Sequence, residues 1–232
     1  MDLKKALENL KEKHVTLVAF GDSITENNHW TMGMQNWVQL LESNLYNIFP
    51  KRATVINSGR SGDSLPHCLE RLEQDVLRFQ PDIVIVSFGT NDCANEDPEG
   101  FRTMYRDMLK QILAAGAIVV TRTPTPWINM EKGGELTHRH NGKVIDLERY
   151  VAVIKEVSAE LDVYCIDHYA SWKKSLESKY RGEMMMLMGN AIHPNGNGHR
   201  RYYYEIAPHF GLPPFLQKDF EHLLWREDEY KV

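Results

Sequence analysis

Ser23 is a candidate nucleophile because of its position after a strand-like run. Residues 15–20 are mostly apolar and β-prone, which predicts a buried strand, and Gly21 indicates a turn directly after it. Asp22 and Ser23 would then lie at the carboxyl end of the strand, where open α/β sheets bind their ligands. A serine hydroxyl needs a base, a group that orients the base, and donors for the developing oxyanion. Ser23 therefore needs partners from elsewhere in the chain.

Three later segments bring polar groups in a definite order. Gly59 follows a second strand-like run at residues 53–57, and Gly89-Thr90-Asn91-Asp92 follows a third at residues 83–88. The last segment, Ile192-His193-Pro194-Asn195, lies near the C-terminus. Together with the turn at Ser23, these segments resemble the motifs of the SGNH/GDSL hydrolase family, from residue 15 to about residue 205.

The resemblance implies a role for each matched position. Ser23 would be the nucleophile and its backbone N–H one oxyanion donor. Gly59 would supply a second backbone donor, Asn91 a third from its side-chain amide, and His193 the general base. Ser23 Oγ would attack an ester carbonyl, and His193 would take the proton and return it to the leaving alcohol. The resemblance also implies a flavodoxin-like, three-layer α/β/α fold, and this chemistry needs neither a metal nor a cofactor.

The chain departs from the family pattern at Asn190. The family has an aspartate three residues before the histidine, where this sequence reads Asn190-Ala191-Ile192-His193. Asparagine can accept a hydrogen bond from His193 Nδ1–H without bringing charge, or it can present its NH₂ and impose the wrong tautomer. Surrounding hydrogen bonds could hold Asn190 as the acceptor, a main-chain carbonyl could orient His193 instead, or Asn190 could be an engineered or degenerate change in a slow enzyme. Our hypothesis is a working hydrolase in which Asn190 orients His193.

A second segment, Gly62-Asp63-Ser64-Leu65, spells the GDSL motif literally. Ser64 lies several residues beyond its strand rather than at the turn, and the family's nucleophile belongs to the first strand. We therefore interpret Ser64 as the N-cap of a helix over residues 65–79.

Strand and helix patterns alternate along the chain. Strand-like runs occur at residues 15–20, 53–57, 83–88, 117–121 and 163–167. Helical spacing occurs at residues 2–12, 34–49, 65–79, 97–115, 144–161, 168–180 and 195–210. The alternation predicts one α/β domain over residues 1–232 with a five-stranded parallel sheet between helix layers. Residues 211–232 are expected to form a helical tail that covers a sheet edge or joins a subunit interface, so a homo-oligomer is possible.

Residues 124–142 are expected to form a long loop, which is often a lid or a binding loop. The loop contains Trp127, His138 and His140. The two histidines could be metal ligands, but surface or substrate-loop histidines are commoner, and we predict no metal.

The composition is typical of a soluble globular protein, with 42% hydrophobic and 25% charged residues. A net charge of −5 and the lack of a basic stripe argue against a nucleic-acid partner. The longest apolar run, at residues 112–120, is too short to cross a bilayer, and residues 1–14 lack the apolar core of a signal peptide. The three cysteines form no CxxC motif, which favours reduced thiols. We expect a cytoplasmic protein; the alternative is a signal removed before residue 1.

Asp22, Trp30 and Trp127 are the candidate substrate contacts. Both tryptophans fall in loops expected beside the site, and aromatic faces suit sugar rings. Related SGNH enzymes include acetylesterases of acetylated sugars, so the resemblance implies a small-acyl esterase of a small-molecule or oligosaccharide ester. The alternatives are a lysophospholipase or thioesterase of the same family, and a carbohydrate-binding pseudoenzyme, which Asn190 supports. A nucleotide- or flavin-binding protein is disfavoured because neither a P-loop nor a strand-linked G-x-G-x-x-G is present.

Overall fold

The fold is built on a parallel five-stranded sheet. The structure is a computed structural model, and it describes residues 1–26, 29–49, 53–137, 139–140 and 143–212. The strand order is β2-β1-β3-β4-β9. The strands are β1 (Val15–Gly21), β2 (Ala53–Gly59), β3 (Ile83–Ser87), β4 (Ile118–Arg122) and β9 (Tyr164–Ile166). Because β1 pairs with β2 on one side and β3 on the other, the chain changes direction across the sheet at β1. The loops after these three strands therefore meet at a topological switch point.

β1 shows why the sheet carries a helix layer on each face. Leu17 and Ala19 pack into one apolar cluster, whereas Val18 and Phe20 pack into the other, and all four are buried. This is the period-two alternation of a strand whose two faces are both covered.

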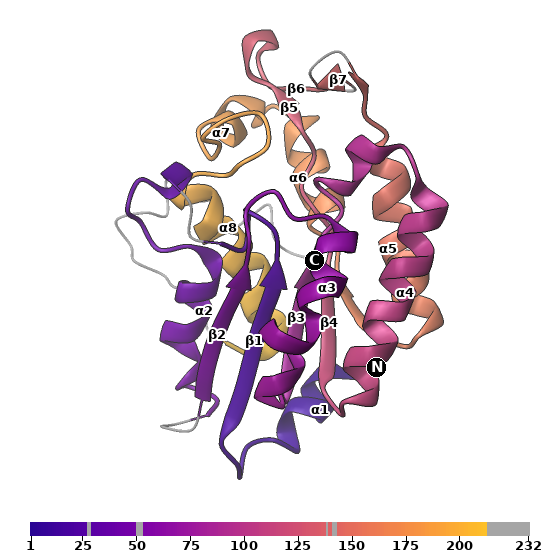
Figure 1. The fold of residues 1–232 in the computed structure, drawn as a ribbon. Coiled ribbons are helices and arrows are strands. Elements are labelled where there is room, and N and C mark those ends of the chain that lie inside the picture. The colour runs from indigo at the N-terminus through magenta and orange to yellow at the C-terminus, as the bar shows by residue number, and fades with distance from the viewer. Residues whose placement is uncertain (27–28, 50–52, 138, 141–142, 213–232) are drawn as a thin grey trace.

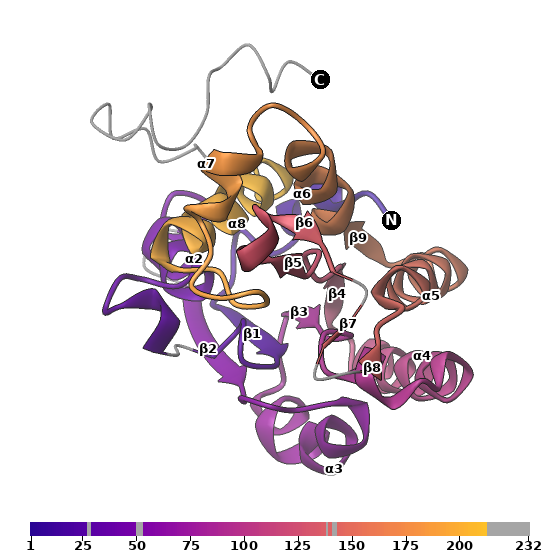
Figure 2. The same cartoon turned by 90° about the horizontal axis from the view of Figure 1, so that it is seen from above.

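Helices from separate parts of the chain form the two layers. Apolar residues of five helices join the Leu17 cluster: α1 (Leu3–Glu8), α2 (Trp37–Leu45), α6 (His168–Leu176), α7 (Arg181–Met185) and α8 (Gly196–Ile206). Residues of three others join the Val18 cluster: α3 (Leu65–Asp75), α4 (Pro98–Ala114) and α5 (Leu147–Glu160). Figure 2 shows α2, α6 and α8 on one side of the strands and α3, α4 and α5 on the other. The predicted three-layer α/β/α class is confirmed.

The predicted helices are present with different ends, and local chemistry explains the differences. α2 begins at Trp37 because Asn36 and Gln39 form a capping box: Asn36 Oδ1 accepts from Gln39 N at 3.0 Å, and Gln39 Oε1 accepts from Asn36 N at 2.9 Å. The helix predicted over residues 195–210 ends its α-helical part at Ile206 and continues as a 3₁₀ turn, Ala207–Phe210, around Pro208, which has no N–H to donate. The short helix α7 (Arg181–Met185) was not predicted.

The segment predicted as a loop over residues 124–142 is partly ordered as short strands. β5 (Ile128–Asn129) pairs antiparallel with β6 (Glu135–Leu136), and β7 (Arg139–His140) pairs with β8 (Lys143–Val144). His138 lies outside the described residues, as does the side chain of His140, so their suggested metal role is not addressed. The tail expected to be helical also lies outside, from residue 213 onward.

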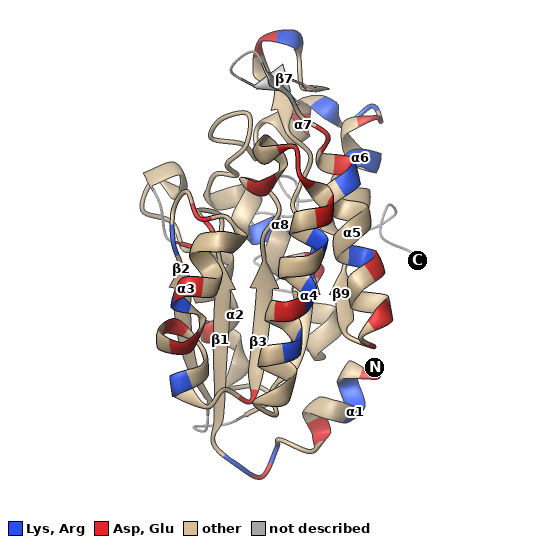
Figure 3. Cartoon of the chain, turned by 45° about the vertical axis from the view of Figure 1, so that its right-hand side comes forward, with Lys and Arg blue, Asp and Glu red and all other residues tan. Residues whose placement is uncertain are grey.

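The outer surfaces of α4 and α5 are joined by ion pairs. Arg106 binds Glu160 through two hydrogen bonds of 2.8 Å, and Arg102 binds Glu156. Figure 3 shows basic and acidic residues interspersed along these two helices. Among the described residues, none of the helices has the length and hydrophobicity needed to span a membrane.

Candidate active site

The fold brings Ser23 and His193 into hydrogen-bond contact across 170 positions of sequence, with Ser23 Oγ 2.9 Å from His193 Nε2. Ser23 lies in a tight turn after β1, in which Thr25 N and Glu26 N both donate to Asp22 O at 3.0 Å. A Cβ on Gly21 would lie 2.1 Å from Thr25 Oγ1, so only glycine allows this turn to close. The arrowheads of β1 and β2 point to the end of the molecule that holds α7, β5 and β6 (Figure 1), which is the end where the turn lies.

Asn190 accepts three hydrogen bonds through one oxygen. Its Oδ1 accepts from Ile192 N at 2.8 Å and from His193 N at 2.7 Å, and it lies 3.2 Å from His193 Nδ1. Backbone N–H groups only donate, so the atom that faces the imidazole is the carbonyl oxygen and not the NH₂. Nδ1 therefore carries the proton, and Nε2 is left as the acceptor for Ser23 O–H. This geometry corresponds to the first of the three accounts of Asn190, in which surrounding hydrogen bonds hold it as the acceptor.

Trp30 covers the imidazole of His193. It belongs to a 3₁₀ turn, His29–Thr31, and its ring stacks on His193 with centroids 5.6 Å apart and planes 10° apart. Burial, and to a lesser degree the nearby His29, lowers the pKa of His193 below its ordinary value. The imidazole is therefore neutral near pH 7, which is the form that can accept a proton from Ser23.

Gly59 is the last residue of β2 and Asn91 follows β3, the two strands that flank β1, so both lie at the same sheet edge as Ser23. Asn91 Nδ2 donates to Asp63 O at 2.8 Å, which uses one of its two N–H groups. Gly59 N already donates to Asn57 Oδ1 at 2.9 Å. An oxyanion at this position would therefore share the Gly59 N–H with Asn57.

Ser64 occupies the N-cap position of α3, as predicted, but its side chain makes no capping hydrogen bond. The cap comes instead from Asp92, whose Oδ1 accepts from Leu65 N at 2.8 Å while its Oδ2 accepts from Gly89 N at 3.1 Å. Asp92 was not among the predicted site residues. The available signal was its place directly after Asn91, at the end of a buried strand.

Asp22 is buried in the turn that carries Ser23. It is 1% exposed, and its Oδ1 accepts from Ile24 N at 3.0 Å. Burial raises the pKa of its carboxyl group to about 7, with a smaller lowering by that hydrogen bond. The carboxyl group of Asp22, which was predicted as a substrate contact, is buried in the fold and stabilises the turn that presents Ser23.

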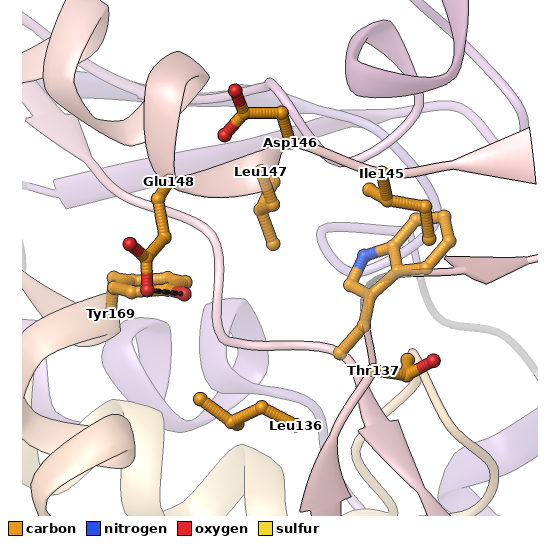
Figure 4. Close-up of a pocket in the computed structure, with 8 residues that line it drawn as sticks. Leu136, Thr137, Ile145, Asp146, Leu147, Glu148 and Tyr169 are labelled. Atoms are coloured by element: carbon orange, nitrogen blue, oxygen red, sulfur yellow. Dashed lines mark hydrogen bonds between the residues drawn. The ribbon is translucent and has the colours of Figure 1, made fainter.

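Trp127 lies beside the His193 loop. It is 6% exposed, and its neighbour Ile128 donates from N to Ala191 O at 3.0 Å. Trp127 lines a cavity of about 120 Å³, whose other lining residues are Leu136, Thr137, Ile145, Asp146, Leu147, Glu148 and Tyr169. Figure 4 shows Asp146 and Glu148 at this cavity and the 3.0 Å hydrogen bond from Tyr169 O–H to Glu148.

Comparisons with known proteins show which family the chain belongs to. A model of the GDSL-like lipase/acylhydrolase family matches residues 19–201. An uncharacterized lipoprotein of Bacillus subtilis (strain 168), YqeF, is 24% identical over 204 residues, which are 78% of this chain and 81% of the relative. A lipase/acylhydrolase from Enterococcus faecalis has the same fold, with a TM-score of 0.67, 24% identity, and coverage of 87% of this chain and 99% of that one. An acetylxylan esterase from Geobacillus stearothermophilus matches with a TM-score of 0.70, 19% identity, and coverage of 88% and 98%. Since the family match covers most of the sequence, the chain belongs to the GDSL-like lipase/acylhydrolase family and is an ester hydrolase of the SGNH type.

Proposed function

We propose that the protein is a serine esterase that removes small acyl groups, acetyl in particular, from carbohydrate esters. The observation that carries this proposal is the chain of contacts from Ser23 Oγ to His193 Nε2, and from His193 Nδ1 to Asn190 Oδ1. In this reaction Ser23 is the nucleophile, His193 the base, and Asn190 the group that orients the base.

The proposed reaction has two halves. Ser23 O–H gives its proton to His193 Nε2 as Oγ attacks the ester carbonyl, and the tetrahedral oxyanion is stabilised by N–H donors of Ser23, Gly59 and Asn91. When the intermediate collapses, His193 gives the proton to the leaving alcohol and an acyl-enzyme remains on Ser23. A water molecule then attacks the acyl group with the same base, which releases the acid and restores Ser23 O–H.

Two features support the oxyanion assignment. The hydrogen bond from Asn91 to Asp63 O fixes the plane of the amide, and it leaves the second N–H of the amide for the oxyanion. A Cβ on Gly59 would lie 2.2 Å from Glu26 N, so the absence of a side chain lets the end of β2 approach the turn that carries Ser23.

The substrate class is proposed from the rings near the site and from the neighbours. Trp30 offers an aromatic face beside His193. The cavity at Trp127 combines an indole with the carboxylates of Asp146 and Glu148, and apolar rings with convergent polar groups are typical of small-molecule sites. β9, which leads to Tyr169 of this cavity, lies three strand spacings from β1, about 14 Å. We therefore place a sugar unit beyond the esterified one in the cavity. One structural neighbour is an acetyl-xylooligosaccharide esterase.

The first test is hydrolysis of p-nitrophenyl acetate by the wild type, Ser23→Ala and Ser64→Ala, each shown to be folded by circular dichroism. We expect turnover to be lost in Ser23→Ala only, because Ser64 lies at the start of α3 and not beside His193. Loss in Ser64→Ala alone would show that the wrong serine was chosen. A panel of acetylated mono- and oligosaccharides then defines the alcohol. Faster turnover of lysophospholipids or acyl thioesters than of any acetylated sugar would favour the alternative activities.

A carbohydrate-binding pseudoenzyme is the second candidate, and two observations favour it. Asn190 brings no charge to His193, and the Gly59 N–H is already bonded to Asn57. A folded wild type that binds acetylated oligosaccharides in calorimetry, but does not hydrolyse them or p-nitrophenyl acetate, would establish this function instead.

We also propose a cytoplasmic location, which the three free cysteines Cys68, Cys93 and Cys165 support. The Bacillus relative is a lipoprotein, so the proposal needs its own test. Fractionation of cells that express the native gene should place the protein in the soluble fraction, and recovery with the membranes would contradict it. Sedimentation of the same material measures whether it forms a homo-oligomer.

A further inference from the structure

Arg71, on α3, is a buried arginine behind the site, with 8% of its side chain exposed. Its Nε donates to Asp63 Oδ2 at 2.6 Å, and its Nη1 donates to Ser58 O at 2.9 Å and to Asp75 Oδ2 at 3.1 Å. Its Nη2 donates to Gly21 O at 3.1 Å. One guanidinium thus joins the ends of β1 and β2 to the loop that follows β2.

The bond to Ser58 O acts directly on a proposed oxyanion donor. Ser58 C=O and Gly59 N–H belong to one planar peptide group, so holding the oxygen also sets the direction of the N–H. A cation bound to the carbonyl oxygen also polarises the peptide, and this strengthens the N–H on its other side as a donor. The bond from Arg71 therefore sets the direction of the Gly59 N–H and strengthens it as a hydrogen-bond donor.

The bond to Asp63 acts on the other proposed donor. Asp63 uses its carboxylate to bind Arg71 and its backbone oxygen to accept from Asn91 Nδ2 at 2.8 Å. The loop Gly62-Asp63-Ser64-Leu65, which spells the GDSL motif without holding the nucleophile, thus links Arg71 to the Asn91 amide.

The third bond reaches the nucleophile turn. Gly21 O accepts from Arg71 and also from Arg60 N at 3.0 Å, and Gly21 precedes Asp22 and Ser23. The guanidinium lies 4.6 Å above the ring of Phe20, in the same strand, which fixes its plane.

We propose that Arg71 is a positioning residue of the oxyanion site, which sets the Ser58–Gly59 peptide directly and the Asn91 amide through Asp63. This inference rests on the proposed function for its catalytic consequence. Stability alone is a weak reason for such a residue, because buried ion pairs contribute little compared with apolar packing of the same volume. Arginine suits the role because its planar fork reaches four acceptors at once, whereas lysine is a point charge on a flexible stem.

The decisive variant is Arg71→Lys, which keeps the charge and loses the fork. We expect kcat for p-nitrophenyl acetate to fall about 10- to 100-fold, because a displaced oxyanion donor weakens transition-state binding. KM should stay within about threefold, because the acyl group is bound elsewhere. The matched control is Arg201→Lys: Arg201 is also buried and paired, with Nε 2.9 Å from Glu205, but it belongs to a different network. It should lower the melting temperature without changing kcat.

A spectroscopic readout tests the inference without turnover. In ¹H–¹⁵N spectra, Arg71→Lys should move the Gly59 backbone amide and the Asn91 side-chain amide signals, and Arg201→Lys should leave both in place. Unmoved signals in Arg71→Lys would overturn the proposal. If the wild type proves inactive, the proposed function fails while this measurement still decides the role of Arg71.

A double-mutant cycle with Asn91→Ala separates positioning from general damage. If Arg71 acts through the oxyanion donors, its substitution should cost less kcat when Asn91 is already absent. If the fold-reductions in kcat of the two single variants multiply in the double variant, the proposal is contradicted. Should Arg71→Lys not fold, Asp63→Asn removes the charged partner while keeping the backbone oxygen that binds Asn91, and the same two amide signals should move.

Discussion

At the scale of single residues, Asn190 separates two contributions that an aspartate would make together. One is geometric: an oxygen held by Ile192 N and His193 N fixes the tautomer of the imidazole through Nδ1. The other is electrostatic: a carboxylate stabilises the imidazolium that forms when Ser23 loses its proton. This chain keeps the geometry and lacks the charge, so the two contributions can be measured apart.

The substitution Asn190→Asp should raise the rate and change its pH dependence. A carboxylate beside Nδ1 stabilises the imidazolium, so we expect kcat/KM at pH 8 to rise about 10- to 100-fold. The pKa of His193 in the wild type lies below its ordinary value of 6.5. Activity should therefore persist below pH 6.5, until the pH reaches this lowered pKa. In the variant the pKa is higher, and the acidic limb of the kcat/KM profile should move to higher pH. An unmoved limb and an unchanged rate would mean that this position carries no catalytic electrostatics.

Asn91→Ala tests the side-chain donor. We expect kcat to fall about 10²–10³-fold, the usual cost of one oxyanion donor, with the fold intact by circular dichroism. The exposed Asn95, in the 3₁₀ turn Asp92–Asn95 that directly follows Asn91, gives the control Asn95→Ala, which should leave kcat unchanged. A fall in kcat of less than threefold in Asn91→Ala would show that Asn91 is not an oxyanion donor.

At the scale of elements, the site is held by the ends of strands and helices rather than by the loops alone. The carboxylate of Asp92 ties the start of α3 to the turn after β3 by accepting from Leu65 N and Gly89 N. A Cβ on Gly189 would lie 2.9 Å from the Trp30 ring, so the absence of a side chain at Gly189 lets the 3₁₀ turn pack on the His193 loop. These contacts explain how four loops from distant parts of the chain keep one geometry.

The cap of α3 gives a stability prediction. Asp92→Ala leaves the N–H groups of Leu65 and Gly89 without their acceptor, which should lower the free energy of unfolding by about 2–3 kcal/mol. Ser64→Ala should change it by less than about 0.5 kcal/mol, because Ser64 makes no capping bond. Urea unfolding at pH 5, below the pKa of about 6 that Asp92 has in the fold, measures both. Equal losses of unfolding free energy in the two variants would show that Ser64 also caps α3.

How far the sequence predicted these elements depends on the range of the forces involved. The strands, helices and the order of the four motifs were predictable because each follows a local apolar pattern. The bonds of Arg71 to Gly21, Ser58 and Asp63 were not predictable, because they depend on which strands are neighbours. β5 to β8 were missed because each has two residues and no periodicity to detect. Nor could local sequence tell that the ring of Trp30 covers His193 while that of Trp127 lines a separate cavity.

At the scale of the whole molecule, buried ionisable groups under the site give opposing pH dependences. Burial raises the pKa of Asp22 to about 7 and that of Asp92 to about 6. Burial also lowers the pKa of His168 to about 4 and that of His199 to about 3. The carboxyl groups disfavour folding as pH rises and the imidazoles disfavour it as pH falls, so the two sets of groups offset one another between about pH 4 and 7.

The contribution of Asp22 can be isolated with Asp22→Asn. Between pH 4 and 7 the folded protein keeps a proton on Asp22 that the unfolded chain loses, because the pKa is 3.8 in the unfolded chain and about 7 in the fold. The folded state then binds more protons, so this group lowers stability as pH rises through that window. The variant has no such proton to lose and keeps an amide oxygen for Ile24 N. The melting temperature of Asp22→Asn minus that of the wild type should therefore increase from pH 4 to pH 8, by several degrees at about 1.4 kcal/mol per pKa unit.

Thermal scans of both proteins at five pH values measure this difference in melting temperature. Ser64→Ala is the control, and its difference from the wild type should not change with pH. A difference that is constant or decreases with pH would show that Asp22 is already ionised in the folded protein near pH 5.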